Sequence, residues 1–530
     1  MKQEHIIDSS TDTRTYNNKT YEYTHGYGAV ITSASRVDDN GNLEYIQNNF
    51  SNNNKIKIEE PRIYFGLETN EPIVTNAKNK QEYDYPLNSI TSSTNTYNGT
   101  AGLELNFIDR VILGIKERKI GIAFSTNVTK NSKIITTRNI IERAKTIMPY
   151  LKYDEKPYMI ITDSGKLVWV LDAYTTSNNY PYSQETIIEY EGMREKINYI
   201  RNSVKVLIDP YNGTTKFYIT DDTDPIVTVY KNIYPELFTQ EIIPEEIAKH
   251  ISYPKYLYEI QSKMLEKYHN IQTEVLYRQD DVWSVSKENT TRTTSATTGS
   301  TIEPYYTQVK TVDNNSSILG LVIPYTISGK QNIISYLVGT YDNQNNKKLT
   351  LYKFKSENSI LGITQLDTLV EQDEKISKEL NTLNVTGTKI EKNIIVVPIN
   401  NTLLYVEPIY QVMLNNESQV PLLKKIVVAS GNKVAIGNDI KKALTNLLSQ
   451  EAIDIEIVSE NKDELIEQII NANKNLEQSN ISNNWEMIGR DMSKLQELIQ
   501  QLEKIVEQEL MQKEETLDEN TNINEVTNSI

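Results

Sequence analysis

The sequence predicts an α+β fold, in which mixed, hairpin-rich sheets pack against helices and an amphipathic or coiled-coil helix lies near the C-terminus. Three observations carry this prediction: two strong hairpin signals, amphipathic helical stretches on either side of them, and a late heptad pattern. The chain has 530 residues, which is enough for more than one compact region with a substantial buried core.

The first α+β region is expected over residues 1–283. Apolar residues recur at a period near 3.6 in LELNFIDRVILGIKERKIGIAF and again in SKIITTRNIIERAKTI, which predicts amphipathic helices. In order along this region we expect helices at about 104–147, hairpins at about 157–220 and helices at about 233–270.

Each of the two hairpins is marked by its turn. In the first, YMIIT and LVWVL flank Asp163-Ser164-Gly165-Lys166. In the second, two apolar runs flank Tyr211-Asn212-Gly213, and Asn-Gly is the pair that a type I′ turn prefers.

A run of small polar residues, SVSKENTTRTTSATTGSTIE, separates this region from the rest of the chain. Such a run has no apolar side chains to bury, so it predicts a flexible linker. The expected order from there is a linker at 284–303, a second α+β region at 304–450, a polar connector at 451–484, a heptad helix at 485–512 and a disordered acidic tail at 513–530.

The heptad helix carries an apolar seam with alternating spacings of three and four residues. An apolar seam of this length has to meet another surface, which is the body of the chain, a second copy or a protein partner. The seam residues are Trp485, Ile488, Met492, Leu495, Ile499, Leu502 and Val506.

Composition excludes several classes of function. The chain has no cysteine and four histidines with no close spacing, so transition-metal sites and thiol chemistry are not expected. Its net charge of −16 argues against nucleic-acid partners. No phosphate-binding loop, nucleophile elbow or run of about 18 apolar residues is present, so we expect no organic cofactor and no membrane span within this chain.

Two segments resemble one another in outline. YMIITDSGKLVWVLDAYTTS and NIIVVPINNTLLYVEPIYQV both run from an apolar strand through a tight turn to an apolar-aromatic strand and then an acidic residue. Two unrelated hairpins would produce this pattern, and so would an internal duplication.

The densest unusual segment is LDAYTTSNNYPYS, which combines tyrosines, hydroxyls and amides directly after an apolar strand. It is either a ligand-binding surface or an internally packed loop. Its candidate binding residues are Asp172, Tyr174, Thr175, Thr176, Asn178, Tyr180 and Tyr182. His25, in YTHGYGAV, is a further candidate, with a turn histidine bonded to the backbone as the alternative.

Carboxylates crowd one hairpin and the turn that follows it. Oxygen ligands of this kind suit calcium, although most acidic turns are simply solvated. Calcium is therefore the one metal to test, with Asp209, Asn212, Asp221, Asp222 and Asp224 as candidate ligands. An acid–base pair for hydrolysis could be drawn from Asp172, Asp209 or Glu407, but no spacing selects a pair.

Several long motifs together are similar to uncharacterised protein family 0182, which comprises bacterial multi-span membrane proteins. The motifs are YTHGYGAV at 23–30, PYLKYDEKPY at 149–158, LVWVLDAYTTSNNYPYS at 167–183, the stretch 197–226, ISYPKYLYEIQSKMLEKYH at 251–269, YRQDDVW at 277–283 and LLYVEPIYQ at 403–411.

The resemblance implies that this chain matches the C-terminal, extracytoplasmic part of such proteins and lacks their membrane spans. It implies a location at the cell membrane, with attachment through the missing N-terminal spans. The region itself is then expected to be extracytoplasmic, and on its own it would be soluble. The resemblance implies no catalytic residues. The two functional hypotheses are a non-catalytic module that binds a lipid, a wall polymer or a protein, and a carboxylate-dependent enzyme acting on an envelope substrate.

Overall fold

The computed structural model confirms the mixed α+β fold. It describes residues 16–38, 40–48, 56–87, 91–290, 300–311, 314–341, 346–354, 360–399, 402–414 and 421–451, with a few positions between 469 and 498. The chain divides into two compact units, one ending at Ala443 and the other beginning at Leu444. The first unit holds nearly all of the described structure.

The N-terminal part of the first unit consists of short paired strands and two helices. Strand β1 pairs with β4, β2 with β3, β5 with β8, and β6 with β7, all antiparallel. The elements are η2 (Asn18–Glu22), β1 (Gly26–Tyr27), β2 (Ile31–Val37), β3 (Leu43–Gln47), β4 (Arg62–Ile63), β5 (Ile73–Thr75), β6 (Glu82–Pro86), β7 (Ser92–Asn95), α1 (Phe107–Lys116), α2 (Gly121–Phe124) and β8 (Lys133–Ile135).

The first five-stranded sheet follows helix α3 and contains both predicted hairpins. Its order is β10-β11-β14-β15, and β9 pairs with the later half of β11 beside β10. Hairpin β12–β13 is inserted between β11 and β14. The elements are α3 (Ile140–Ile147), β9 (Lys152–Tyr153), β10 (Tyr158–Ile161), β11 (Leu167–Ser177), β12 (Thr186–Tyr190), β13 (Met193–Ile197), β14 (Tyr199–Ile208) and β15 (Thr215–Ile219).

Helices then lead into a second five-stranded sheet. Here β19 and β16 pair with successive parts of β20, and β20, β21 and β22 follow in order. The elements are α4 (Pro225–Ile233), η3 (Pro235–Leu237), α5 (Glu245–Ala248), α6 (Lys255–Tyr268), α7 (Thr273–Arg278), β16 (Trp283–Val285), β17 (Lys287–Glu288), β18 (Ser300–Thr301), β19 (Tyr305–Thr311), β20 (Asn314–Ile327), β21 (Ile333–Tyr341) and β22 (Lys347–Lys353).

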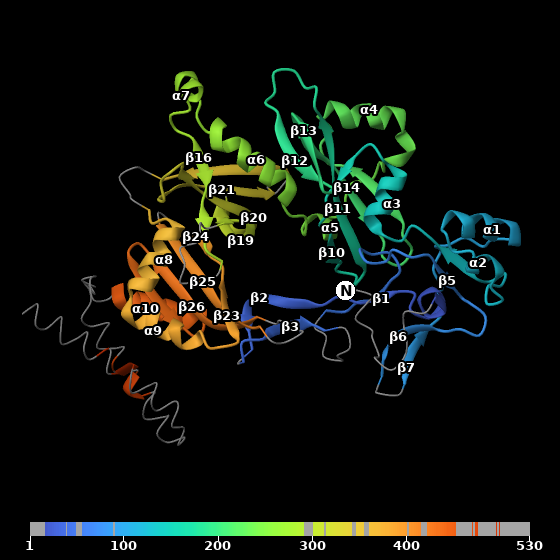
Figure 1. Cartoon of the computed structure of the whole chain (residues 1–530), viewed down its shortest axis with the longest axis horizontal. Coiled ribbons are helices and arrows are strands. Elements are labelled where there is room, and N and C mark those ends of the chain that lie inside the picture. Colours follow the sequence, from blue (N-terminus) through green and yellow to red (C-terminus); the bar gives the residue numbers. More distant parts are fainter. Residues whose placement is uncertain are drawn as a thin grey trace, which may run out of the picture. The chain divides into compact units, whose positions relative to one another are not determined.

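A third five-stranded sheet repeats the connectivity of the first two. In each sheet the first and second strands share one edge of the third, and the third, fourth and fifth strands follow in order. Its elements are α8 (Ile363–Gln372), α9 (Glu374–Leu383), β23 (Thr388–Lys392), β24 (Ile395–Ile399), β25 (Thr402–Met413), β26 (Leu422–Ser430), β27 (Lys433–Gly437) and α10 (Ile440–Glu451). Figure 1 shows the three sheets in green, yellow and orange.

Two large apolar cores hold these sheets. The first lies on one face of the first sheet, where Leu171, Val206 and Phe217 meet Ile140 and Ala144 of α3. The second is shared by the second and third sheets and includes residues of α8 and α9. The second and third sheets are therefore joined through buried side chains, whereas the first sheet has a core of its own.

The structure corrects the helix predicted over 132–147. Only 140–147 is helical, because Asn139 caps α3 by accepting from the amides of Ile141 (3.0 Å) and Glu142 (3.2 Å). Ile134 and Ile135 ahead of it are both buried in strand β8. Adjacent buried β-branched residues favour a strand, and the helical period had concealed this.

The flexible linker predicted at 284–303 is also corrected, because its two described ends form paired strands. Trp283–Val285 pairs with β20, Lys287–Glu288 pairs with Ser300–Thr301, and Ile302 is buried in the core. Residues 291–299 lie outside the described part of the chain. The composition of the segment did not reveal that its two ends pair with one another.

The C-terminal predictions fall largely outside the described residues. Of the heptad seam only Leu495 is described, and it packs with Leu498 against Ile469 and Ala472. The other six seam positions and the acidic tail are not described. Among the described residues, no helix combines the length and apolarity needed to cross a membrane.

Candidate functional site

A cleft of about 470 Å³ opens on the first sheet and is the candidate site. Its apolar wall is formed by side chains of β11, β14, β15 and α5, among them Val168, Leu207, Tyr218 and Ile247. Charged and amide groups stand around this wall: Glu60, Lys166, Asp209, Asn212 and Lys216. Such a combination of an apolar wall with convergent polar groups is typical of a ligand-binding cleft.

The turn from Asp209 to Thr214 builds one rim of the cleft. Asp209 Oδ1 accepts from the amides of Tyr211 (2.8 Å) and Asn212 (3.2 Å), and Asn212 Oδ1 accepts from the amide of Thr100 (2.8 Å). Gly213 has a φ of +67°, and a Cβ there would lie 2.5 Å from the ring of Phe65.

The hairpin predicted at this turn is confirmed, but the type I′ geometry is wrong. Ile208 pairs with Thr215, so six residues connect β14 and β15, and only Gly213 has a positive φ. A type I′ turn is a two-residue loop that needs a positive φ at both of its residues.

Aromatic rings connect this rim to the protein interior. The ring centroid of Tyr211 lies 5.1 Å from that of Tyr97 and 5.5 Å from that of Tyr64. Tyr64 in turn lies 4.9 Å from His25. Such tilted aromatic contacts contribute packing energy beyond burial alone, and they fix the orientation of Tyr211 at the cleft.

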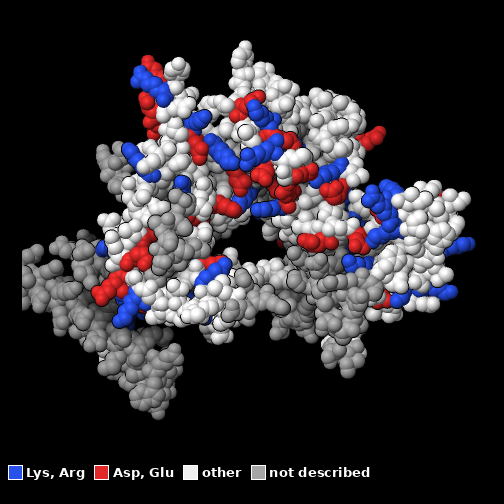
Figure 2. Space-filling view, in the orientation of Figure 1, with Lys and Arg blue, Asp and Glu red and all other residues white. Residues whose placement is uncertain are grey.

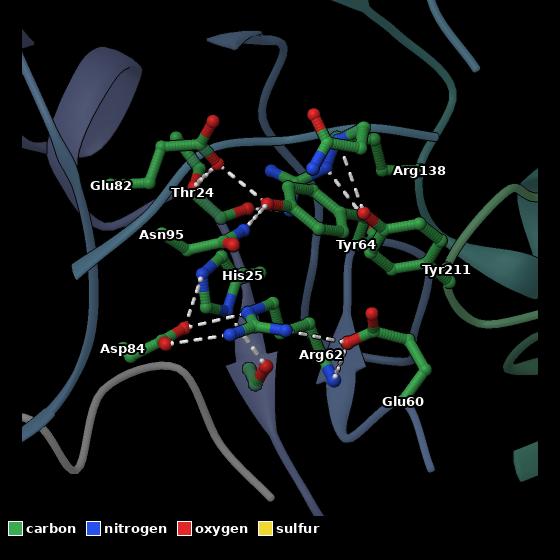
Figure 3. Close-up of polar contacts among 12 residues, drawn as sticks. Thr24, His25, Glu60, Arg62, Tyr64, Glu82, Asp84, Asn95, Arg138 and Tyr211 are labelled. Carbon is green, nitrogen blue, oxygen red and sulfur yellow. Dashed lines mark hydrogen bonds and ion pairs between the residues drawn. The ribbon is translucent and has the colours of Figure 1, made fainter. Parts of the chain in front are cut away.

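A buried ionic cluster lies behind Glu60, as Figure 3 shows. Arg62 donates to both oxygens of Asp84 at 2.9 Å and to Glu60 Oε1 at 3.0 Å. His25 Nε2 lies 3.3 Å from Asp84 Oδ1. Arg62 therefore ties a carboxylate of the cleft rim to a fully buried carboxylate and, through it, to His25.

Both ring nitrogens of His25 face hydrogen-bond acceptors. Its Nδ1 lies 3.0 Å from the carbonyl oxygen of Gly26, while its Nε2 faces Asp84. A neutral imidazole has only one proton for these two acceptors. Burial, opposed by the Gly26 carbonyl and Asp84 but reinforced by Arg62 and Arg138, lowers the pKa of His25 to about 4. The alternative prediction of a turn histidine bonded to the backbone describes its surroundings better than an open binding residue.

A second buried carboxylate, Glu82, lies beside this cluster. Its Oε2 accepts from Thr24 Oγ1 and Tyr64 OH, both at 2.6 Å, and Asn95 donates to the Tyr64 oxygen at 3.0 Å. Burial raises the pKa of Glu82 despite these donors. The bonds lock the Tyr64 ring that supports Tyr211.

Arg138 holds the backbone around the cluster. Its guanidinium donates to the carbonyl oxygens of Tyr64 (2.8 Å), Glu71 (3.0 Å) and Thr24. It is fully buried, and that burial lowers its pKa to about 10. The YTHGYGAV segment is therefore fixed to the connection between β4 and β5 by a charged group that is directed at backbone oxygens.

The predicted binding segment after β11 separates into an inner and an outer part. Asp172 is buried and ion-paired with Lys205, Tyr174 OH donates to Asp154 Oδ2 at 2.8 Å, and Thr175 Oγ1 donates to Asp224 Oδ2 at 2.5 Å. These three side chains serve internal packing, because each has its polar group bonded within the protein.

The outer part of this segment is available at the surface. Thr176 is half-buried and Asn178 is exposed. Tyr180 stacks on Tyr199 with centroids 4.9 Å apart, and Tyr182 is fully exposed. None of these residues lines the cleft, so the tyrosine segment and the cleft are separate surfaces.

The candidate calcium ligands do not meet at one point. Asp209 stabilises its own turn, whereas Asp221 accepts from Thr223 and Arg201. Asp224 caps α4 through the Ile226 amide and also accepts from Ser203 and Tyr199. Across the described residues, no group of three or more His, Asp or Glu side chains is arranged to hold a metal ion.

Sequence reasoning found Asp209, Asn212 and His25 but missed Glu60, Arg62 and Tyr211 as parts of one site. Arg62 begins the short strand β4 and Glu60 lies just ahead of it, about 150 residues before the turn that borders the cleft, and no local pattern connects them. Tyr211 lies in the motif at 197–226 that carries the family resemblance. For the ion pair, the only local signal is that Glu59 and Glu60 stand close to Arg62 in the sequence.

The fold is a mixed α+β architecture built on repeated antiparallel five-stranded sheets, with the cleft on the first of them. The chain belongs to the uncharacterised protein family UPF0182, which it matches over residues 5–383. It is similar to UPF0182 proteins of Caldicellulosiruptor saccharolyticus (36% identity, covering 92% of this chain and 54% of the relative), Clostridium botulinum strain Kyoto (37%, 84% and 49%) and Trichodesmium erythraeum (32%, 93% and 55%).

The chain thus spans about half the length of these relatives. No solved structure matches it.

Proposed function

We propose that this chain is a non-catalytic binding module of an envelope-associated membrane protein, and that its cleft takes a cell-wall polymer. The observation that carries the proposal is the cleft itself, where an apolar wall with Tyr218 stands beside Glu60, Asp209 and Asn212. Carboxylate, amide and tyrosine groups suit a ligand that presents alternating apolar ring faces and hydroxyl or amino groups.

The rigidity of the rim supports binding to a fixed shape. Tyr211 is held by Tyr97 and Tyr64, and Glu60 is held by Arg62. A site that is ordered before its ligand arrives loses less conformational freedom on binding. The ionic cluster behind the cleft therefore has a supporting role, since its buried groups are bonded to one another.

The alternative is a carboxylate-dependent enzyme acting on an envelope substrate. It would need an acid and a base facing one substrate. Of the carboxylates considered from the sequence, Asp172 and Glu407 lie in different sheets, and each is buried in its own ion pair. Of these three only Asp209 lines the cleft, and its Oδ1 accepts from the amides of its own turn. Glu60 also lines the cleft but is ion-paired with Arg62, so we prefer the binding module.

The proposed location follows from the family resemblance. That resemblance implies membrane spans ahead of this region and an extracytoplasmic position for the region itself. The relatives contain about as much chain again outside the matched part, which leaves room for such spans. The heptad seam is the proposed contact for self-association or a protein partner.

Co-sedimentation with purified peptidoglycan tests the proposed ligand. We expect the chain to sediment with the polymer, and Thr214→Trp, which places a large ring at the mouth of the cleft, to reduce the bound fraction at least about tenfold. Thr214 is exposed, so this substitution leaves the core unchanged.

Thr220→Trp is the matched control, because Thr220 is also exposed beside β15 but does not line the cleft. The proposal fails if the chain does not sediment, or if both tryptophan variants bind like the parent. Release of soluble fragments from the polymer would instead support the enzyme alternative.

A further inference from the structure

Helices α1 and α2 present an apolar surface to solvent. Its members are Phe107, Ile108, Ile112, Ile115, Ile120 and Phe124, and each has between 48% and 68% of its surface exposed. The rings of Phe107 and Phe124 lie edge to face at 5.8 Å, which joins the two helices into one continuous patch. We call this set the α1–α2 patch. It appears as a white area around these helices in Figure 2.

The opposite face of the same helices is also apolar. Leu113 and Ile122 are buried against Tyr21, Val74 and Ile134. The helix pair is therefore anchored to the body through one face while the other face remains uncovered. A surface helix normally exposes a polar face, so exposed apolar side chains beside a buried apolar face indicate that the uncovered side has a further contact.

Basic residues outnumber acidic ones in the segment that carries the patch, in contrast to the acidic chain as a whole. The segment from Leu103 to Lys133 contains six Lys or Arg and three Asp or Glu, whereas the whole chain has a net charge of −16. Lys116, Arg118 and Lys130 are exposed. Figure 2 shows basic side chains bordering this region.

We propose that the α1–α2 patch docks on the surface of an anionic lipid bilayer, with its phenylalanine and isoleucine side chains entering the headgroup–acyl boundary. Amphipathic helices bind membranes in this way when an apolar face is bordered by Lys and Arg. The inference rests on the proposed function for the presence of a membrane nearby. It adds a second membrane contact, separate from any spanning helix and from the cleft.

The form of the patch favours lipid over a protein partner. Its side chains are exposed on α1 and α2 and in the turn between them, and none of them lines the cleft on the first sheet. A protein partner would require a matching concave surface, whereas a bilayer adapts to any convex apolar shape. The basic border complements an anionic headgroup layer directly.

Flotation with lipid vesicles tests this proposal. We expect the chain to float with vesicles that contain phosphatidylglycerol, to float less with pure phosphatidylcholine, and to lose binding as salt is raised. The double variant Ile108→Ser/Ile112→Ser removes two exposed isoleucines, and its partitioning should fall at least about tenfold.

The matched control is Ile242→Ser/Ile271→Ser, since these isoleucines are 89% and 95% exposed and lie outside the patch. It should float like the parent chain. Thermal melts of both double variants check that folding is retained, and Ile112→Trp should show a blue-shifted emission on vesicles.

The proposal is overturned if the parent chain does not float, or if the control loses as much binding as the patch variant. It is also overturned if sedimentation velocity shows a dimer that the patch variant alone abolishes, because the patch would then bind a second copy. Peptidoglycan co-sedimentation tests the cleft, whereas vesicle flotation tests the α1–α2 patch. Failure of one experiment therefore does not decide the outcome of the other.

Discussion

The first and third sheets share one connectivity but place their buried carboxylates on opposite faces. In each, the second strand begins opposite a valine of the third strand: Tyr158 pairs with Val170, and Ile395 with Val406. A bulge follows three residues later in both, after Ala173 and after Ile409. The two sheets can therefore be aligned residue by residue.

In this alignment Asp172 is two residues after its valine, and Glu407 is one residue after. Because side chains alternate between faces along a strand, one residue of difference reverses the face. Asp172 lies on the face of Val170 and Leu207, away from the large core of that sheet. Glu407 lies with Tyr405 and Ile409, inside the core shared with the second sheet.

Their partners differ in the same way. Asp172 pairs with Lys205, which is directly opposite on the next strand, and the Asn202 amide also donates to it at 2.9 Å. Glu407 lies 2.9 Å from Lys392 on the first strand, and Lys392 also contacts Asp367 of α8. The topology is thus repeated, while each ion pair belongs to its own sheet.

The largest expected effect comes from breaking the first pair. Asp172→Asn keeps the volume of the side chain but leaves Lys205, which is fully buried, without its carboxylate. Removing one partner of a buried ion pair costs about 3–5 kcal/mol, because an uncompensated charge remains inside. We expect urea denaturation to show a loss of this size in the free energy of unfolding.

The double variant Asp172→Leu/Lys205→Met supplies the control. It removes both charges, so most of the stability should return. A loss below about 1 kcal/mol in the single variant would contradict the view that Lys205 depends on Asp172 alone.

A smaller effect is expected at the third sheet. Glu407→Gln leaves Lys392 with Asp367, so no charge is left unpaired. One oxygen of Glu407 has no hydrogen-bond partner, and burial raises the pKa of this carboxyl. The same denaturation experiment should show a loss of about 1–2 kcal/mol. Equal losses for Asp172→Asn and Glu407→Gln would erase the difference between the two sheets.

A third buried pair, His25–Asp84, extends the comparison because the charge of His25 changes with pH. The folded pKa of His25 is about 4, below its ordinary value of 6.5, so the unfolded chain binds the proton first as pH falls. Stability should therefore decrease as pH drops from about 6.5 to 4, by up to about 3 kcal/mol, and this loss should level off below pH 4.

His25→Gln removes this proton from both states. Denaturation midpoints measured across the same pH range should vary less in the variant than in the parent. Identical pH profiles would show that other groups, such as Glu82, set the acid response.

The sequence predicted the parts of the fold that depend on local patterns. Both hairpins, helix α6 and the pair β24–β25 of the third sheet follow from periodicity and from turn residues such as Asp163 and Gly213. The similarity between YMIITDSGKLVWVLDAYTTS and NIIVVPINNTLLYVEPIYQV also corresponds to a real repetition of topology. The second sheet shares this topology, and its sequence gave no such sign.

The cleft could not be predicted in the same way. It depends on Glu60 lying beside Asp209 and Tyr211, which requires the tertiary pairing of β1 with β4 and the insertion of Arg62 between Glu60 and Asp84. Acidic turns such as Asp221–Asp224 attracted a calcium prediction because composition does not show which carboxylates cap helices. In the structure Asp224 is such a cap, so its lone pairs are directed at backbone and hydroxyl donors.

The smallest stability effect is expected at the cleft rim, from Glu60→Gln. Glu60 is a partly exposed member of the Arg62 pair, and Arg62 keeps both bonds to Asp84 when Glu60 is neutralised. Surface ion pairs contribute about 0–1 kcal/mol, so denaturation should show little change, in contrast to Asp172→Asn. Peptidoglycan binding should nevertheless fall, because the substitution removes a charge that faces the cleft. If stability falls by several kcal/mol instead, Glu60 belongs to the buried cluster and cannot serve as an independent ligand-binding group.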